Sequence, residues 1–436
     1  MKISRRNALM SALFGAGYIG LRALATGLPA AALLRGGRRA FAEGSCLDPA
    51  KAQFIIFNTS GQGDPMNANA PGTYADAGIV HCPDPAMAAT QMTIGGKQVT
   101  AARPWTQMDA AVLSRTAFWH IMTNTPVHPK EPEVLKLLNS TQYNEMLPSL
   151  LAKQLAPCLG TIQAQPITLG ARTPSEGLSF DGQALPIIPP TALKATLTSP
   201  SGPLSNLTQL RDQTLKQLDD LYRGSANAAQ KKYLDSLITS QSEVRNIKQD
   251  LLGALGSIVD DSEQSQITAA IALIKMNVTP VIAIHIPFGG DNHNDNGLVN
   301  EAAETIAGVT TINSLMQQLA SEGLSDKVTF MTLNVFGRTL GAGSLGGRQH
   351  NENHQVSLTI GKPFKSSLIG GVGPSGKDFG ALAIDSSTGK GGNGGDINPI
   401  ETLSSFGKTM LAAVGAESSF IEEAVIGGKV VSAALA

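Results

Sequence analysis

Two apolar segments joined by a long amphipathic segment constrain the fold of this chain more than any other feature. The apolar segments cover residues 279–286 and 327–334, and residues 299–321 between them have the spacing of a helix. Two buried strands joined by a crossover helix run in the same direction. The sequence therefore predicts an α/β fold with a largely parallel sheet.

The rest of the chain continues this alternation. We expect strands at 53–58 and 117–122, helices at 131–138, 144–155, 266–275 and 401–414, and irregular connections at 160–205 and 361–398. Residues 206–255 instead carry apolar residues at helical spacing over a long stretch. We interpret this stretch as a helical insertion packed on the sheet, and a binding or dimerising arm is the alternative.

The N-terminal segment has the pattern of an export signal. Arg5 and Arg6 precede two uncharged runs, and the motif Ala-Phe-Ala at residues 40–42 suits a signal peptidase. The segment resembles a twin-arginine signal peptide, which predicts a signal at 1–42 and a mature domain at 43–436. A membrane anchor is the alternative, but Arg22 and Pro29 interrupt the run before it reaches the ~20 apolar residues of a spanning helix. We expect a periplasmic or secreted protein with no transmembrane anchor after cleavage.

The mature domain is acidic although the whole chain is nearly neutral. Seven of the 33 basic residues precede Ala42, so the remaining 26 face 34 acidic residues and leave a net charge of about −8. Proteins that bind nucleic acid need a basic surface to neutralise phosphates. The composition therefore argues against nucleic acid as a partner.

The three cysteines are too few for a disulfide framework, and none lies in a CxxC pair. Cys46 and Cys82 are close enough in sequence to form one disulfide outside the cytoplasm. The pattern argues against a cysteine-based zinc or redox site.

The densest group of potential metal ligands is the sequence GGDNHNDN at residues 289–296, directly after an apolar strand. Asp291, His293 and Asp295 alternate there, so an extended segment would place all three on one side. Carboxylate and imidazole groups that converge in this way bind divalent metals. The alternative is that these residues cap turns and the following helix.

Other histidines and one aspartate extend this candidate site. Four histidines lie in loops after strands: His128, His293, His350 and His354. Asp64 follows the first strand and could either join these loops or form a turn before Pro65. His120 and His285 lie within apolar strands, where a histidine hydrogen-bonded in the core is the more common case.

A glycine-rich segment, GVGPSGK at residues 371–377, matches most of the phosphate-binding GxxxxGK pattern. Asp378 follows it where the pattern requires Ser or Thr, and no convincing helix begins there. We therefore do not expect nucleotide binding at this segment.

Taken together, these segments resemble the exported family called domain of unknown function 1501, a branch of the alkaline phosphatase and sulfatase superfamily. The resemblance covers the paired-arginine signal, the turn at 64–71, the stretch LIKMNVTPVIAIHIPFGGDNH, and the motif FGRT at 336–339 with the glycine-rich turn that follows. It implies an alkaline phosphatase-like fold, with a mostly parallel sheet sandwiched between helices and the insertion at about 206–255.

The resemblance also implies a site with one or two divalent metals, either zinc, manganese, calcium or magnesium. Its metal ligands would be Asp64, Asp291, His293, His350 and His354. Arg338 would steady an anionic group, and Thr125 stands where the superfamily places its nucleophile. Val335 and Gln349 replace acidic residues that the family usually has, which weakens the inference to catalysis.

Two functions follow from this resemblance. The first is an exported metal-dependent hydrolase-like protein that acts on a small anionic ester, either a phosphate or a sulfate. The second is a catalytically degenerate relative that keeps the fold and binds another protein of the cell envelope. Metal content and co-purification with a partner would discriminate the two.

Overall fold

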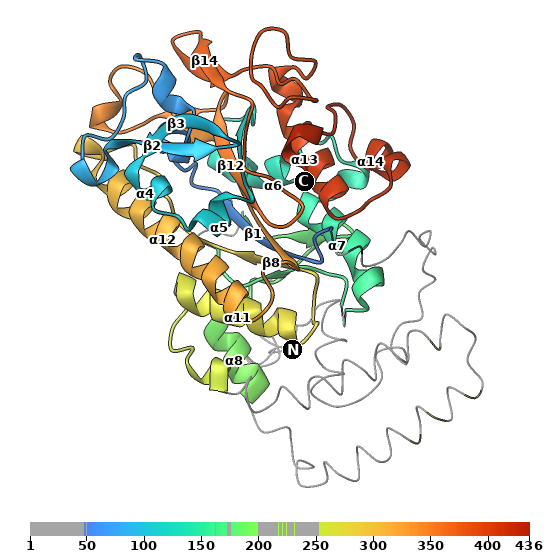
Figure 1. Ribbon diagram of the computed structural model, residues 1–436. Coiled ribbons are helices and arrows are strands. Elements are labelled where there is room, and N and C mark those ends of the chain that lie inside the picture. The colour runs from blue at the N-terminus through green and yellow to red at the C-terminus, as the bar shows by residue number, and fades with distance from the viewer. Residues whose placement is uncertain are drawn as a thin grey trace, which may run out of the picture.

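The described residues of the computed structural model form a seven-stranded sheet at the centre of the molecule (Figure 1). The model describes residues 50–161, 163–171, 176–198 and 253–436, with a few single positions besides. The signal peptide expected at 1–42 and nearly all of the helical insertion expected at 206–255 lie outside the described residues.

The strands of this sheet follow one another in the order β13 (Ser367–Ile369), β4 (Thr116–Ile121), β12 (Gln355–Ile360), β9 (Val328–Asn334), β1 (Phe54–Ser60), β8 (Val281–Ile284) and β5 (Ile167–Thr168). Strands β5, β8, β1 and β9 are parallel, and β13 is parallel to β4. Strand β12 is antiparallel to both β9 and β4. The prediction of an α/β fold with a mostly parallel sheet is therefore confirmed.

Helices cover both faces of the sheet (Figure 1). One face carries α4 (Arg103–Thr106), α11 (Glu263–Lys275) and α12 (Val299–Ser321), and the other carries α6 (Glu131–Leu135), α7 (Leu147–Leu159), α13 (Thr402–Ala413) and α14 (Ser418–Ala424). Strand side chains alternate between these layers, so that Ile56 packs on the α11 side while Ile55 and Phe57 pack on the α7 side. This two-sided burial explains why β1, β4, β8 and β9 are mostly apolar on both faces.

Shorter elements decorate this core. They are α3 (Met66–Asn69), α5 (Ala110–Leu113), α8 (Pro190–Thr198), and the two-stranded pairs β2–β3 (Ala89–Ile94 and Lys97–Ala102), β6–β7 (Ser179–Phe180 and Gln183–Ala184), β10–β11 (Gly337–Arg338 and His350–Asn351) and β14–β15 (Val372–Ser375 and Asp378–Ala381). The glycine-rich segment at 371–377 thus forms most of the β14–β15 hairpin. This agrees with the expectation that it is not a phosphate-binding loop.

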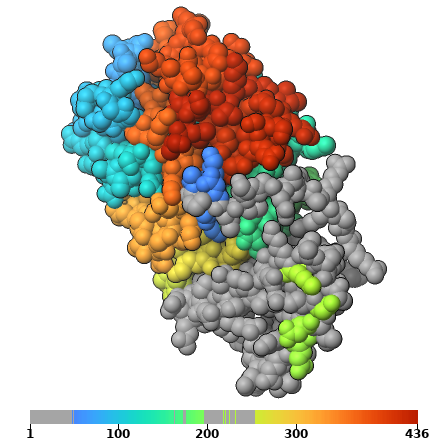
Figure 2. All heavy atoms as spheres, turned by 45° about the vertical axis from the view of Figure 1, so that its right-hand side comes forward, coloured from blue at the N-terminus to red at the C-terminus, as the bar shows by residue number. Residues whose placement is uncertain are grey.

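The N-terminal end of the described chain lies against the end of α13. The amide of Ala52 donates a hydrogen bond of 3.0 Å to the carbonyl oxygen of Ala413. Figure 2 shows the first described residues, in blue, at the surface beside the C-terminal segment, in red. Strand β1 is therefore fixed at its beginning by the last large helix of the core.

One expectation about the cysteines is corrected. Cys82 is a buried free thiol, so it does not pair with Cys46, and Cys158 in α7 is the cysteine that forms a disulfide. None of the helices in the described residues has both the length and the apolar character needed to cross a membrane.

Strands β1, β4, β8 and β9 all point the same way, so their carboxyl ends lie at one edge of the sheet. Open α/β sheets bind ligands at this edge. The loops that leave these four strands carry the candidate metal ligands.

Candidate metal centre

The loop after β8 positions Asp291 and His293. Its far end is fixed by Asp295, whose two carboxylate oxygens accept hydrogen bonds of 2.9 Å from the amides of Asn300 and Glu301 in the first turn of α12. These amides have no partner within the helix, so the contact caps α12. Asp295 therefore caps α12 and is not a metal ligand, as the alternative interpretation of this loop expects. Asp291 and His293 do lie at the site.

The pair β10–β11 positions His350 opposite Arg338. Before β11 the chain passes very close to the β8 loop at Gly347, where an added Cβ would lie 2.1 Å from the carbonyl oxygen of His293. Gly347 also has φ +118°, a conformation that favours glycine. A glycine is therefore needed for the two ligand loops to meet.

A buried ion pair ties the segment before β11 to the first turn of α12, which follows the β8 loop. Arg348 and Glu301 are both fully buried, and Nε of the arginine lies 2.6 Å from a carboxylate oxygen of the glutamate. The second carboxylate oxygen accepts a bond of 3.2 Å from the guanidinium. Asn292 joins them through its side-chain amide, 3.3 Å from Glu301, and through its carbonyl oxygen, which accepts from the Arg348 amide. This network fixes the distance between His293 and His350.

His128 enters the site from a third direction, on a short 3-10 helix after β4. Its Nδ1 lies 2.8 Å from the carbonyl oxygen of Gly61, in the loop that leaves β1. Residues from the loops after β1, β4, β8 and β9 therefore lie together at the candidate site. The carboxyl ends of these strands lie at one edge of the sheet, which predicts this.

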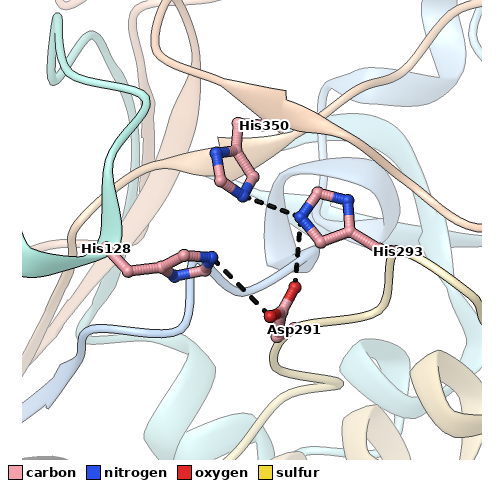
Figure 3. Close-up of side chains that lie close together, drawn as sticks. All are labelled: His128, Asp291, His293 and His350. Carbon is pink, nitrogen blue, oxygen red and sulfur yellow. Dashed lines mark hydrogen bonds and ion pairs between the residues drawn. The ribbon is translucent and has the colours of Figure 1, made fainter.

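His128, Asp291, His293 and His350 form a group whose ligand atoms all lie within 4.8 Å of one another (Figure 3). The Nε2 atom of His293 lies 2.8 Å from Nε2 of His350 and 3.3 Å from Oδ1 of Asp291, and Nε2 of His128 lies 3.7 Å from Oδ2 of the same carboxylate. These side chains are partly exposed. Such a group could hold a metal ion that solvent and ligands reach.

The other ring nitrogen of each histidine contacts an oxygen atom. Nδ1 of His128 contacts the carbonyl oxygen of Gly61, Nδ1 of His350 contacts that of Pro126, and Nδ1 of His293 lies 3.0 Å from the side-chain oxygen of Gln349. A carbonyl oxygen can only accept, so each Nδ1 carries the hydrogen and each Nε2 presents its lone pair to the centre. Histidines that bind metals are oriented in this way.

Arg338 contacts two residues of the same group. Its guanidinium lies 3.0 Å from Oδ1 of Asp291 and 3.3 Å from Nε2 of His293, and it also donates to the carbonyl oxygens of Gln62 and Gly63. The side chain is fully buried. The anion that Arg338 steadies in this structure is Asp291.

Phe336 supports the site as a packing surface. Its ring lies 4.3 Å from the ring of His350 and 5.0 Å from that of His128, measured between centroids, and the Arg338 guanidinium lies 5.4 Å from its centre. Burial and the nearby charges of Arg338, His128 and His293 lower the pKa of His350, while its bond to Pro126 opposes this shift. A lowered pKa keeps the imidazole neutral, which is the form that binds metals.

Asp64 lies outside this group of four. It is buried after β1, its Oδ1 accepts a bond of 2.9 Å from Ser60, and its Oδ2 has no partner among the described residues. Burial raises its pKa to about 6, with His285 and Ser60 opposing the shift. The charge of Arg338 also lowers the pKa of Asp64 slightly. Asp64 therefore lies near the centre without being one of its four clustered residues.

His354 is also outside the group, and both of its ring nitrogens are occupied. Nδ1 lies 3.3 Å from the side-chain amide of Asn67, Nε2 lies 2.9 Å from Nδ1 of His120, and Nε2 of His120 lies 2.8 Å from the carbonyl oxygen of Pro71. Burial lowers the pKa of both histidines. This chain of hydrogen bonds leaves His354 no nitrogen for a metal.

Thr125 is buried in the loop after β4, and its hydroxyl has no hydrogen-bond partner among the described residues. It precedes Pro126, whose carbonyl oxygen fixes His350. No hydrogen bond among the described residues joins the Thr125 hydroxyl to the four clustered residues. Thr125 is therefore a buried residue next to the centre.

His128 was not predicted to be a metal ligand from the sequence. The available signal was its position in a loop after a strand, which it shared with three other histidines. What distinguishes His128 from His354 is the partner of each Nδ1, which is the carbonyl oxygen of Gly61 for His128 and the side-chain amide of Asn67 for His354.

Comparison with models of known protein families finds no match, and comparison with curated proteins finds none either. Membership of a family therefore remains a proposal that rests on the motifs of the sequence.

Proposed function

We propose that the protein binds one divalent transition metal, with zinc as the best fit, through His128, His293, His350 and Asp291. The observation that carries this proposal is the orientation of the three imidazoles, each with Nδ1 on an oxygen acceptor and Nε2 toward the centre. Zinc prefers imidazole and carboxylate ligands in this number. Calcium and magnesium prefer oxygen ligands alone, so a site with three nitrogens disfavours them.

We further propose that the protein is an exported hydrolase-like member of the alkaline phosphatase and sulfatase superfamily, which acts on a phosphate or sulfate ester. The mostly parallel sheet between helices and the position of the cluster at the carboxyl ends of the strands support this assignment. A bound metal would polarise the ester oxygen and lower the pKa of water. Partial exposure of the ligands admits a small substrate, and Arg338 adds positive charge beside it.

A second function, a binding component of the cell envelope that keeps the fold without catalysis, is favoured by a specific observation. Four protein side chains converge on the centre, which is the number that structural zinc sites use, whereas catalytic sites keep one position open. The hydroxyl of Thr125 is also buried. In this case the metal would hold together the loops that carry its ligands and so stabilise the fold.

An assay for hydrolysis of 4-nitrophenyl phosphate and 4-nitrophenyl sulfate by the zinc-loaded protein distinguishes the hydrolase from the non-catalytic binding protein. Catalysis predicts turnover that disappears after chelation, returns with zinc, and is lost in His350→Ala but not in His81→Asn. His81 is a suitable control because it is a partly buried histidine outside the group, stacked on Tyr74. A protein that retains zinc yet hydrolyses neither ester would favour the non-catalytic function.

A further inference from the structure

A pocket of about 450 Å³ opens beside the carboxyl ends of β5 and β8, at the beginnings of α8 and α11. Leu169, Ile187 and Pro189 are among the apolar residues that line it. Its ionisable lining residues are Asp261, Glu263 and His285, and none of the described residues that line it is Lys or Arg. Its size is that of a site for a small ligand.

His285 and Gln266 are the two buried polar residues among those that line this pocket. Nδ1 of His285 lies 3.2 Å from a carboxylate oxygen of Glu176 and 3.3 Å from the carbonyl oxygen of Thr59, both inside the protein. The residue is 9% exposed and lines the pocket. Its Nε2 makes no hydrogen bond with a described residue. Since the Nδ1 edge is turned inward, the Nε2 edge faces the pocket and is open to a ligand.

The neighbours of His285 hold it in this orientation. The other oxygen of Glu176 accepts a bond of 2.9 Å from the amide of Gly61, and Gln266 accepts one of 2.8 Å from the amide of His285. Both Glu176 and Gln266 are buried. A carboxylate that accepts from Nδ1–H leaves Nε2 of a neutral imidazole as a hydrogen-bond acceptor.

The two outer carboxylates differ in what they do. Asp261 accepts bonds of 2.9 Å from the amide and the hydroxyl of Thr191, so it fixes the beginning of α8. The carboxylate of Glu263, in the first turn of α11, makes no hydrogen bond or ion pair with a described residue. Glu263 is therefore the carboxylate that can turn to a ligand.

We propose that this pocket binds a small organic cation, an ammonium or guanidinium group on an apolar body. The cationic N–H groups would donate to Nε2 of His285 and to the Glu263 carboxylate, and the apolar body would pack on the Leu169 and Ile187 walls. Charge-assisted hydrogen bonds of this kind are stronger than those between neutral groups. The site shares no lining residue with the metal centre.

Isothermal titration of the full chain with n-butylammonium, n-butanol and butyrate tests the proposal. Butylammonium should bind, and butanol and butyrate should bind much more weakly. Glu263→Gln should weaken butylammonium binding by about threefold or more. Glu417→Gln removes an equal charge from an exposed position and should leave it unchanged. His350→Ala should also leave it unchanged, because that residue belongs to the metal centre.

A second measurement tests the role of His285 without a variant that might misfold. Burial lowers the pKa of His285, but its bond to Glu176 and the charges of Glu176 and Asp64 outweigh this, so its pKa is raised. A cation that needs the lone pair on Nε2 would displace a proton from His285 at pH 6. The heat of binding should therefore differ between phosphate and MES buffers, which differ in their heats of ionisation and carry no net positive charge. Equal heats in both buffers, or equal affinity for butanol and butylammonium, would overturn the proposal.

Discussion

The Nε2 atoms of His293 and His350 lie 2.8 Å apart, although each ring already uses its Nδ1 hydrogen on an oxygen acceptor. Two lone pairs at this distance repel each other unless a proton or a metal ion lies between them. Nε2 of His293 also accepts a hydrogen bond of 3.3 Å from the Arg338 guanidinium. A divalent metal between the two rings would have Asp291 and His128 as its further ligands.

The close approach of the two ligand loops predicts an effect of Gly347. Gly347→Ala should destabilise the protein by about 1–3 kcal/mol, because the residue has a positive φ, and should weaken zinc binding. Gly346→Ala is the matched control, since an added Cβ there meets no atom within 4 Å. Thermal unfolding and zinc titration measure both effects. Equal behaviour of the two variants would contradict the role of Gly347.

Gln349 predicts a weaker effect on the same site. It contacts Nδ1 of His293 and does not belong to the group of four, so Gln349→Ala should reduce zinc affinity by about 10–100-fold without abolishing it. Gln349→Glu keeps the acceptor oxygen and should retain tight binding. Competition with a chromogenic chelator gives the affinities. An unchanged affinity in Gln349→Ala would show that this contact does not orient the ligand.

The Arg348–Glu301 pair predicts a large effect on stability. Arg348→Met leaves a buried carboxylate without its partner and should lower the free energy of unfolding by about 3–5 kcal/mol. The double variant Arg348→Met with Glu301→Leu should be much less destabilised, because no buried charge remains. Urea unfolding measures both. A double variant as unstable as the single one would indicate that the loss of stability comes from altered packing and not from an unpaired buried charge.

Asp64 predicts a dependence of stability on pH. Its pKa is raised by burial from 3.8 to about 6. Between these values the folded state keeps a proton that the unfolded state has lost, so the free energy of unfolding falls as the pH rises. The fall should reach about 3 kcal/mol and should end above pH 6.

Urea unfolding of the metal-free protein between pH 4 and 7 measures this fall. Asp64→Asn keeps the bond to Ser60 but cannot ionise, so its stability relative to the wild type should increase across this range. A constant difference between the two proteins would show that Asp64 is not responsible.

Much of the fold could be predicted because the central strands are buried on both faces. The runs at β1, β4, β8 and β9 are mostly apolar, and α12 lies at residues 299–321 as its spacing predicts. Strand β12 was not predicted, because its sequence QVSLTI follows a polar loop and contains polar residues. Its Ser357 and Thr359 are buried nevertheless, since hydrogen bonds such as that from Trp119 to Thr359 satisfy them.

Three of the four clustered residues could be predicted from the sequence, because the order of strands and loops along the chain locates them. Asp291, His293 and His350 lie in loops after strands, and position along the chain is enough to find them. His128 and His354 differ in the direction of their rings, which Gly61 and Asn67 determine from other loops. One sequence without coordinates cannot show such contacts between distant loops.

Elemental analysis of the exported protein, purified without chelator and dialysed after incubation with zinc, tests the central claim most directly. We predict one equivalent of metal per chain in the wild type and in His81→Asn, and none in Asp291→Ala or His350→Ala. A wild type that retains no metal, or a His350→Ala variant that keeps its full equivalent, would contradict the proposed centre.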